Sequence, residues 1–395
     1  MVDIGLFGLL VVAIAAGFFL GWRQRGRRLQ QDDRHFGPKY FKGLSYLLND
    51  EADSAVDAFI DSLEVNPDTL ETHLALGNLL RRKGEVAKAT RIHQNLLARP
   101  SLTTQQLHEA QLELARDFIR AGLLDRAEGL LQELVDVNSQ YKAEALGHLI
   151  EIYQDEKDWG KAIESANQLS LRRFGRQAAG ERAIARAHFC CELAEDAMEQ
   201  NDMLAARRYL QNALGFDRQC VRASLLWGEM EHRLGNEREA LKALHRVPHQ
   251  DPELLVESLD LLCACYERLG DHRGLQRYLE ELLAQYPSSS LVIKMAEQVR
   301  WARDDHAAAD FIAEHLRRRP TIKLLNRAVE LYLLHSEGRA RDNLQLLKQL
   351  VDQVMTAKPS YHCKKCGFAG NQMHWLCPGC KTWGSITPIT GVEGE

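Results

Sequence analysis

The sequence has no excess of basic residues. Its 50 Lys and Arg are outnumbered by 55 Asp and Glu, which gives a formal net charge of -5. Proteins that bind nucleic acid or cover anionic lipid present a basic surface, so this balance argues against either as the main partner. The charged share of 27% and the hydrophobic share of 45% are those of a folded chain rather than a disordered one.

The chain also lacks the regular cysteine pattern of a disulfide framework. Of its nine cysteines, four lie close together near the C-terminus and five are scattered through sequence with helical character. Clustered and free thiols together indicate a reducing compartment and a metal. We expect the scattered thiols to be small core residues; they are Cys190, Cys191, Cys220, Cys263 and Cys265.

Charge is absent altogether from Ile4 to Trp22. At about 1.5 Å per residue this run spans roughly 28 Å, close to the hydrocarbon core of a membrane. We therefore predict a transmembrane anchor at 1–22 and a basic juxtamembrane linker at 23–36. The arginines of the linker place all that follows in the cytoplasm by the positive-inside rule; they are Arg23, Arg25, Arg27 and Arg28. A cleaved secretory signal, the alternative, carries its positive charge before the apolar run.

A pattern of small, aromatic and turn-forming residues recurs through the middle of the chain. The steps from Ala206 to Ala240 and from Gly235 to Gly270 are 34 and 35 residues long. This is the period of the tetratricopeptide repeat, a pair of antiparallel helices, and residues 37–357 resemble that family. We predict about nine helix pairs in an all-α solenoid whose concave face binds peptides or proteins.

Each helix pair needs small residues where the two axes come closest. We assign this role on the first helices to Gly43, Gly77, Ala115, Ala194 and Gly228, and on the second to Ala55, Ala89, Ala127, Ala162, Ala206 and Ala240. Seven histidines along the array recur at no ligand spacing, so we interpret them as helix-surface or inter-helix residues. They are His73, His93, His108, His148, His188, His232 and His245.

One interval in the array is too long. Ala162 and Ala206 are 44 residues apart, ten more than one repeat, and the excess lies around residues 171–182. We predict a longer solvated connection between repeats, with a binding patch as the alternative, because insertions in solenoids map to loops. The insertion is rich in arginine: Arg172, Arg173, Arg176, Arg182 and Arg186.

The most specific motif is the spacing Cys-x2-Cys-x10-Cys-x2-Cys, formed by Cys363, Cys366, Cys377 and Cys380. Two Cys-x-x-Cys turns place four thiolates at the corners of a tetrahedron, the geometry of a closed structural zinc site. About 30 residues cannot build a core unaided, so metal binding supplies the folding free energy of this segment. We predict one metal held by these cysteines, zinc, with iron as the alternative.

Residues 358–395 resemble a rubredoxin-type zinc ribbon, including the Cys-Pro-x-Cys turn. Rubredoxin has glycine after its last cysteine, where this chain has Lys381, and a longer stretch between its cysteine pairs. These departures, and the absence of a flavin or nicotinamide motif, argue against electron transfer, which stays as an alternative function. Because only seven residues separate Met355 from Cys363, we expect the ribbon to lie close to the last repeat helices.

The order of anchor, repeats and ribbon over the whole chain resembles the bacterial lipopolysaccharide assembly protein B family. That resemblance implies a non-catalytic, single-pass adaptor of the inner membrane whose bulk faces the cytoplasm. It also implies two partners, the deacetylase that commits flux to lipid A and the membrane protease FtsH, to which the adaptor brings the deacetylase for degradation. A general membrane-tethered assembly or chaperone scaffold is the other interpretation.

Overall fold

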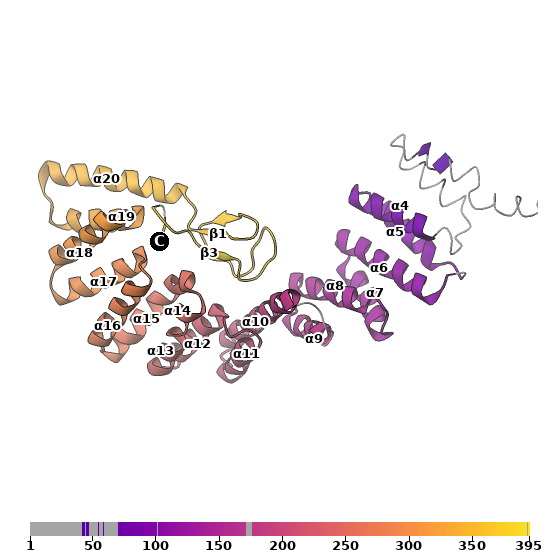
Figure 1. The fold of residues 1–395 in the computed structure, drawn as a ribbon, viewed down its shortest axis with the longest axis horizontal. Helices are drawn as coiled ribbons and strands as arrows, with labels where there is room; N and C mark the ends of the chain where they lie inside the picture. The colour runs from indigo at the N-terminus through magenta and orange to yellow at the C-terminus, as the bar shows by residue number, and fades with distance from the viewer. Residues whose placement is uncertain are drawn as a thin grey trace, which may run out of the picture. The chain divides into compact units, whose positions relative to one another are not determined.

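The computed structural model describes residues 42–43, 45–46, 54, 58, 70–100, 102–170, 176–392 and 394–395 (Figure 1). The predicted anchor 1–22, the linker 23–36 and most of the first repeat lie outside the described residues. Among the residues that are described, no helix has both the length and the apolar content needed to cross a membrane. The chain divides into two compact units between Glu156 and Lys157.

The first unit consists of antiparallel helices joined by short turns, as a tetratricopeptide array requires. Its described helices are α4 (Leu70–Arg82), α5 (Val86–Leu97), α6 (Thr104–Arg120), α7 (Leu124–Asp136) and α8 (Lys142–Asp155). Each helix is amphipathic and buries most of its leucines against its neighbours. Helix α6 begins with a capping box, in which the Thr103 and Gln106 side chains each accept a hydrogen bond from the other residue's backbone N–H.

The second unit continues the helical array and ends in a small sheet. Its helices are α9 (Trp159–Ser170), α10 (Arg176–Glu199), α11 (Met203–Phe216), α12 (Val221–Arg233), α13 (Glu237–Leu244), α14 (Val247–Gln250), the 3-10 helix η1 (Pro252–Leu255), α15 (Val256–Leu269), α16 (His272–Gln285), α17 (Ser289–Ala302), α18 (Asp305–Arg318), α19 (Ile322–His335) and α20 (Gly338–Ala357). Its strands are β1 (Tyr361–Cys363), β2 (Ala369–Gly370) and β3 (Ile386–Pro388). Within this unit the sheet folds back over the earlier helices (Figure 1).

Small residues lie where paired helices approach each other most closely, as the sequence predicted. A Cβ atom added to Gly77 of α4 would lie 2.3 Å from Nε2 of His93 on α5, and one added to Gly228 of α12 would lie 2.7 Å from Cδ2 of Leu244 on α13. The assigned alanines that the structure describes are fully buried. The sequence assignment of these positions is therefore confirmed for the described repeats.

The long interval between Ala162 and Ala206 has a different structure from the one we predicted. Most of the added residues extend helix α10, which has 24 residues where its neighbours α9 and α11 have 12 and 14. The prediction of a solvated loop was therefore wrong for residues 176–182. Arg186, on the same helix, donates to Asn167 Oδ1 at 2.9 Å and covers the Phe216 ring at 4.2 Å from its centroid.

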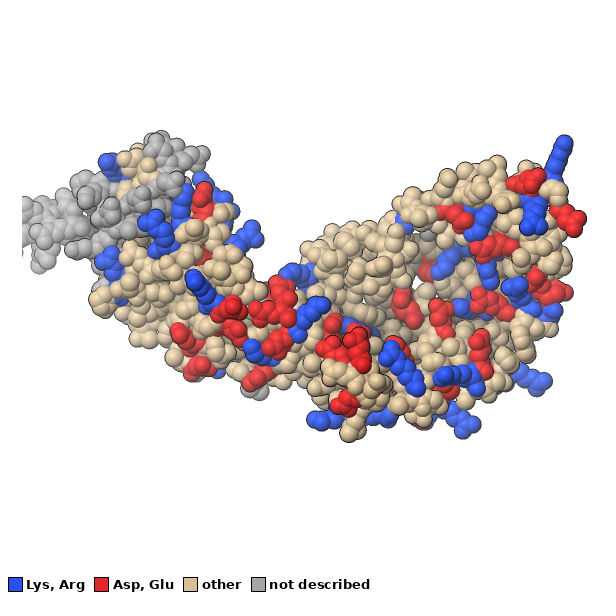
Figure 2. All heavy atoms as spheres, turned by 180° about the vertical axis from the view of Figure 1, so that it is seen from behind, with Lys and Arg blue, Asp and Glu red and all other residues tan. Residues whose placement is uncertain are grey.

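Acidic and basic side chains are interspersed along the repeat helices on the face drawn in Figure 2. Many of these charges pair across neighbouring helices. In the first unit Arg81 of α4 contacts Glu113 at 2.6 Å and Asp117 at 2.9 Å, both on α6, and Asp117 also lies 2.5 Å from Nδ1 of His93. Because Asp117 and His93 are fully buried, this network fixes the imidazole ring directly opposite Gly77.

Replacing Gly77 by alanine is expected to destabilise the first unit by about 1–3 kcal/mol, the usual cost of overpacking a rigid site. The His93 ring cannot retreat without breaking its contact with Asp117. Gly147 of α8 is the matched control, because a Cβ atom there meets nothing within 4 Å. Gly147→Ala is expected to stabilise by up to about 1 kcal/mol through helix propensity. Urea unfolding followed by circular dichroism measures both; equal effects of the two substitutions would contradict the close approach.

Candidate metal centre

The C-terminal segment is a three-stranded antiparallel sheet with the order β2-β1-β3. Strand β1 pairs Tyr361 with Gly370 on one side and Cys363 with Ile386 on the other. The first cysteine of the motif, Cys363, therefore lies at the end of the central strand. A further bridge between Leu376 and Trp383 closes the loop that carries the second cysteine pair. We call residues 358–395 the ribbon.

The two cysteine pairs sit in turns with the same backbone hydrogen bonds. In the first turn the N–H of Cys363 donates to Phe368 O at 2.7 Å, and the N–H of Gly367 donates to Cys363 O at 3.0 Å. In the second turn the N–H of Cys377 donates to Thr382 O at 3.1 Å, and the N–H of Lys381 donates to Cys377 O at 2.8 Å. Each turn therefore aims both of its sulfurs toward the other turn.

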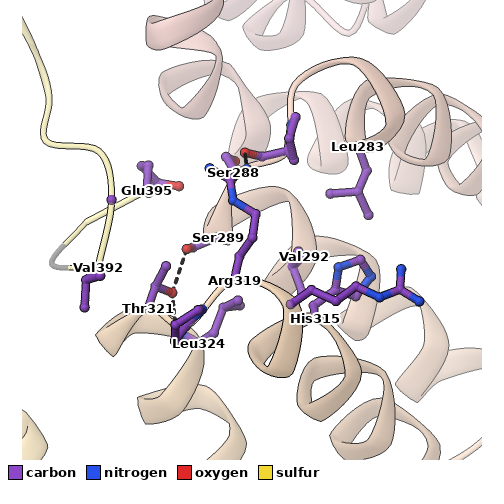
Figure 3. Close-up of a pocket in the computed structure, with 14 residues that line it drawn as sticks. Leu283, Ser288, Ser289, Val292, His315, Arg319, Thr321, Leu324, Val392 and Glu395 are labelled. Carbon is purple, nitrogen blue, oxygen red and sulfur yellow. Dashed lines mark hydrogen bonds between the residues drawn. The ribbon is translucent and has the colours of Figure 1, made fainter.

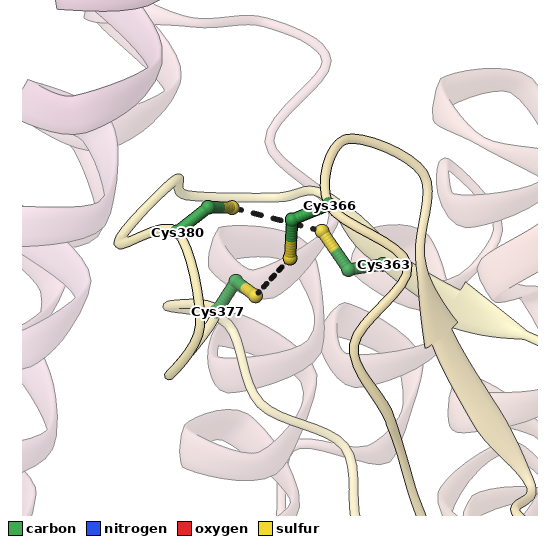
Figure 4. A group of neighbouring side chains, drawn as sticks. All are labelled: Cys363, Cys366, Cys377 and Cys380. Carbon is green, nitrogen blue, oxygen red and sulfur yellow. Dashed lines mark hydrogen bonds between the residues drawn. The ribbon is translucent and has the colours of Figure 1, made fainter.

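The four sulfurs converge, as Figure 4 shows. Sγ of Cys363 lies 3.8 Å from Sγ of Cys380, and Sγ of Cys366 lies 3.6 Å from Sγ of Cys377. All four lie within 4.8 Å of one another. A metal with bonds of about 2.3 Å to four tetrahedral thiolates separates neighbouring sulfurs by about 3.8 Å. The donor set and its spacing thus fit a tetrahedral metal ion.

Three positions beside the sulfurs restrict the backbone. A Cβ atom on Gly379 would lie 3.3 Å from the Cys366 sulfur, so only glycine leaves the sulfurs their full space there. The residues that follow the two pairs, Gly367 and Lys381, have φ angles of 77° and 50°. The lysine that replaces the glycine of rubredoxin therefore adopts the left-handed conformation, at a cost of about 1 kcal/mol, and keeps the turn.

The surroundings favour the thiolate at Cys363, which is 2% exposed. Burial raises the pKa of this thiol, but the Ser385 hydroxyl and the backbone N–H groups of Cys366 and Lys365 outweigh burial and bring the pKa to about 6. Cys377 is fully buried, Cys380 is partly exposed and Cys366 is exposed. His362, directly before the motif, and His374, between its two cysteine pairs, are not in the cluster of ligand atoms.

The ribbon is fixed to the repeats through Trp383. Its ring stacks on His188 of α10 with centroids 4.8 Å apart, and meets Trp159 of α9 and Phe189 of α10 edge-on at 6.2 and 5.9 Å. The Arg222 guanidinium of α12 lies 6.0 Å from the same ring centroid. Trp383 keeps only 8% of its surface exposed. Burying so large a side chain contributes about 3–5 kcal/mol.

Further contacts join the ribbon to α12, α14, η1 and α15. Tyr361 donates to Glu257 of α15 at 2.9 Å, and Lys364 pairs with Glu253 of η1 at 2.7 Å. Met373 and Trp375 pack against an apolar cluster formed by Val221, Val247 and Leu254. The expected contact with the last repeat helices is made by the end of the ribbon, where the N–H of Ile322 on α19 donates to Val392 O at 2.9 Å. The sheet and the cysteine turns pack further back, on α9, α10, α12 and α15. Connection length limits where the ribbon begins, but the apolar surface of these helices decides where it packs.

A second group of ligand-type side chains joins three repeat helices. His232 of α12 lies 2.6 Å from Glu237 of α13, and Cys265 of α15 lies 3.5 Å from the same imidazole nitrogen. Glu237 also accepts from Arg268 at 2.8 Å. Burial raises the pKa of Glu237, but these hydrogen bonds outweigh it and lower the pKa. Because its partners satisfy the carboxylate, we interpret the group as an inter-helix strut, which linear spacing had not revealed.

The five scattered cysteines are all buried, as the sequence predicted. Cys191 of α10 and Cys220 at the start of α12 bring their sulfurs to 4.0 Å. Burial raises the pKa of Cys190 to about 12 and that of Cys263 to about 11. Cys190 and Cys263 are therefore protonated, buried packing residues.

The fold and the site define a tetratricopeptide-repeat protein that carries a rubredoxin-type metal-binding ribbon. A family model described as "Rubredoxin metal binding domain" matches residues 361–388, and a tetratricopeptide repeat model matches residues 191–253. A solved tetratricopeptide repeat protein from Parabacteroides merdae aligns with 72% of this chain and 99% of its own length, at 14% identity and a TM-score of 0.33.

The chain belongs to the lipopolysaccharide assembly protein B family. It is 35% identical to the lipopolysaccharide assembly protein B of Escherichia coli K12 over 98% of this chain and 99% of that protein. It is 32% identical to the protein of the same name from Haemophilus influenzae, with 98% of each chain covered. The members that match are named for lipopolysaccharide assembly.

The contact between His188 and Trp383 is expected to make stability depend on pH. Burial, together with the charge of Arg222, lowers the pKa of His188 to about 3. The ribbon faces the ring with Trp375, Trp383 and Gly384. In the unfolded chain the imidazole binds a proton below a pKa of about 6.5. The contribution of the neutral ring to the free energy of unfolding is therefore fully present above about pH 6.5. It falls as the pH decreases towards 3, because only the unfolded chain binds the proton, and the loss is up to about 2 kcal/mol between pH 7 and pH 5.

Urea unfolding at pH 7, 6 and 5 measures this dependence. His188→Phe is the matched control, because phenylalanine keeps an aromatic ring against Trp383 and carries no proton. The variant is expected to lose less stability than the wild type over this range. Parallel losses in the two proteins would show that His188 does not contribute.

Proposed function

We propose that this chain is a non-catalytic adaptor in lipopolysaccharide assembly, anchored in the bacterial inner membrane with its repeats and ribbon in the cytoplasm. The observation that carries the proposal is the full-length similarity to lipopolysaccharide assembly protein B of two organisms. Repeats alone occur in proteins of many functions, but a match over 98% of the chain includes the ribbon and the N-terminal segment as well.

The proposed action is to bring two proteins together. Tetratricopeptide helices present extended surfaces that bind peptides and proteins. By family resemblance, the clients are the deacetylase of the lipid A pathway and the FtsH protease, which degrades it. An anchor formed by residues 4–22 would hold the adaptor on the same surface as a membrane protease. Their encounter then becomes frequent through effective concentration, without any new contact.

We propose further that Cys363, Cys366, Cys377 and Cys380 hold one zinc ion in a structural role. Zinc supplies no redox chemistry, and four thiolates leave it no open position for a substrate. What the bound metal provides is the fixed position of the two cysteine turns. The loop of the second turn carries Trp383, so the metal sets the orientation in which the ribbon meets α10 and α12. Iron fits the same four sulfurs and is the competing occupant.

Replacing Cys363 and Cys366 together by serine is expected to release the metal and free the ribbon from the repeats. Metal binding and folding are coupled in a segment of this size. The repeats are expected to stay helical, because each repeat is stabilised chiefly by its neighbours. The variant is expected to lose most complementation of a strain that lacks the family protein. Mass spectrometry gives the metal content, and circular dichroism gives the helical content.

Lys365→Ser is the matched control, because this exposed side chain lies between the two exchanged cysteines. It should keep metal and function. Full complementation by the metal-free variant would show that the ribbon is dispensable. A red, iron-containing protein that cycles with reductant in cells would replace the structural role by electron transfer.

The proposed topology has its own test. The arginines after Trp22 place residues 23–395 in the cytoplasm. Alkaline phosphatase, which is active only in the periplasm, is therefore expected to give no signal when fused to the C-terminus. Green fluorescent protein at the same position is the matched control and should fluoresce. A strong phosphatase signal would contradict a cytoplasmic adaptor.

A further inference from the structure

The last residues of the chain lie along the N-terminal turns of helices α17 and α19. The carboxylate of Glu395 accepts from the backbone N–H of Ser290 at 2.9 Å and from its hydroxyl at 2.6 Å, and it forms an ion pair with Lys323. The N–H of Ile322 donates to Val392 O at 2.9 Å. The Ser289 hydroxyl lies 3.4 Å from Gly394 O. We call residues 389–395 the tail.

The tail reaches these contacts by turning back on itself. The N–H of Glu395 donates to Ile389 O at 2.9 Å, and the N–H of Gly391 donates to Glu395 O at 2.9 Å. Gly391 has a φ angle of 105°, in the left-handed region, and a Cβ atom on Gly394 would lie 1.8 Å from Ile389 O. The turn therefore requires glycine at both positions, and it delivers the Glu395 side chain to Ser290.

Two cavities flank the tail and leave room beyond what it fills. One has a volume of about 440 Å³ and lies among α16 to α19; the other, of about 230 Å³, lies between α19, α20 and the ribbon. Figure 3 shows the larger one, with Val392 and Glu395 on one side and His315 and Arg319 among the residues on the other.

The described side chains that line the two cavities carry mainly positive charge. Apart from Glu395, the formally charged ones among them are basic: Arg318, which also pairs with Glu314 at 2.5 Å, Arg319, Lys323 and Lys358. The apolar part of the larger cavity comes from Leu283, Val292 and Leu324. The surface thus combines a few apolar side chains with basic ones, and the Glu395 carboxylate is already bound beside them.

We propose that the groove between α17 and α19 is a docking site for an acidic peptide of a partner protein, and that the tail occupies it in cis. The tail shows the chemistry that the groove accepts: a backbone carbonyl on the N–H of Ile322, and a carboxylate on Ser290 and Lys323. A partner peptide with an acidic side chain after a flexible glycine reproduces both contacts, and the adjoining cavities accommodate its further side chains.

Binding of such a peptide requires displacement of the tail. A tethered segment competes at an effective concentration in the millimolar range, so the free groove binds more tightly than the occupied one. The tail therefore raises the concentration or the affinity that a partner peptide needs in order to bind. This inference deepens the proposed adaptor function by naming the chemistry of one client surface; it does not depend on the identity of the client.

The test is a direct binding measurement on the full-length chain. The probe is a fluorescein-labelled peptide with the tail sequence, Ile-Thr-Gly-Val-Glu-Gly-Glu, and anisotropy reports its affinity. Gly394→Ala releases the tail without altering any repeat helix. The released chain is expected to bind the probe at least about tenfold more tightly than the wild type. A peptide with both Glu replaced by Gln should bind the released chain at least about tenfold more weakly.

Matched charge removals locate the site. In the Gly394→Ala background, Lys323→Met is expected to abolish binding. Lys294→Met, which removes a cation of α17 paired instead with Asp260 and Glu297, should leave binding unchanged. Circular dichroism confirms that each variant is folded. A folded, released chain that does not bind the probe, or binding that is equal in the wild type, would overturn the proposal. Complementation by the ribbon variants is a separate readout, so the proposed function and this inference can fail independently.

Discussion

The burial of Trp383 between α9, α10 and α12 is the contact on which the arrangement of the second unit depends. The ribbon has only a few core residues of its own, and both of its tryptophans, Trp375 and Trp383, pack against the repeats. Because this contact buries the His188 ring, the pKa of the imidazole is lowered and the ring stays neutral. The Arg222 guanidinium lies over the Trp383 ring. It also forms ion pairs with two glutamates of α10, Glu192 at 2.7 Å and Glu195 at 2.8 Å. Metal geometry, aromatic packing and an ion pair are thus coupled at one residue.

This coupling explains why a segment with so little core has a defined position. Four sulfurs fix the turns, the second turn presents Trp383, and Tyr361 and Lys364 add polar contacts to η1 and α15. Residues beyond the last strand then reach α17 and α19. The ribbon therefore contacts helices of several different repeats, whereas each repeat in an ordinary solenoid contacts only its neighbours.

The features that follow from local rules could be predicted from the sequence. The repeat period, the small residues at Gly77 and Gly228, and the four converging cysteines depend on spacings that a helix pair or a metal imposes. The docking of Trp383 on His188 could not be predicted, because no periodicity links residues so far apart. Local pattern likewise does not distinguish a long connection from the extended helix α10. At Lys381 the turn keeps its left-handed backbone although its usual residue is missing.

The order in which the chain is synthesised gives this contact a further consequence. His188 and Phe189 leave the ribosome about 200 residues before Trp383, which at roughly 5–20 residues per second amounts to about 10–40 s. During that interval the aromatic surface of α9 and α10 has no cover, although the helices around it can already form. Maturation of the second unit is thus delayed until translation is nearly complete and metal has been captured. An interrupted or metal-starved product would leave that aromatic surface open to solvent, and chains with exposed apolar surface are the ones that chaperones and proteases engage.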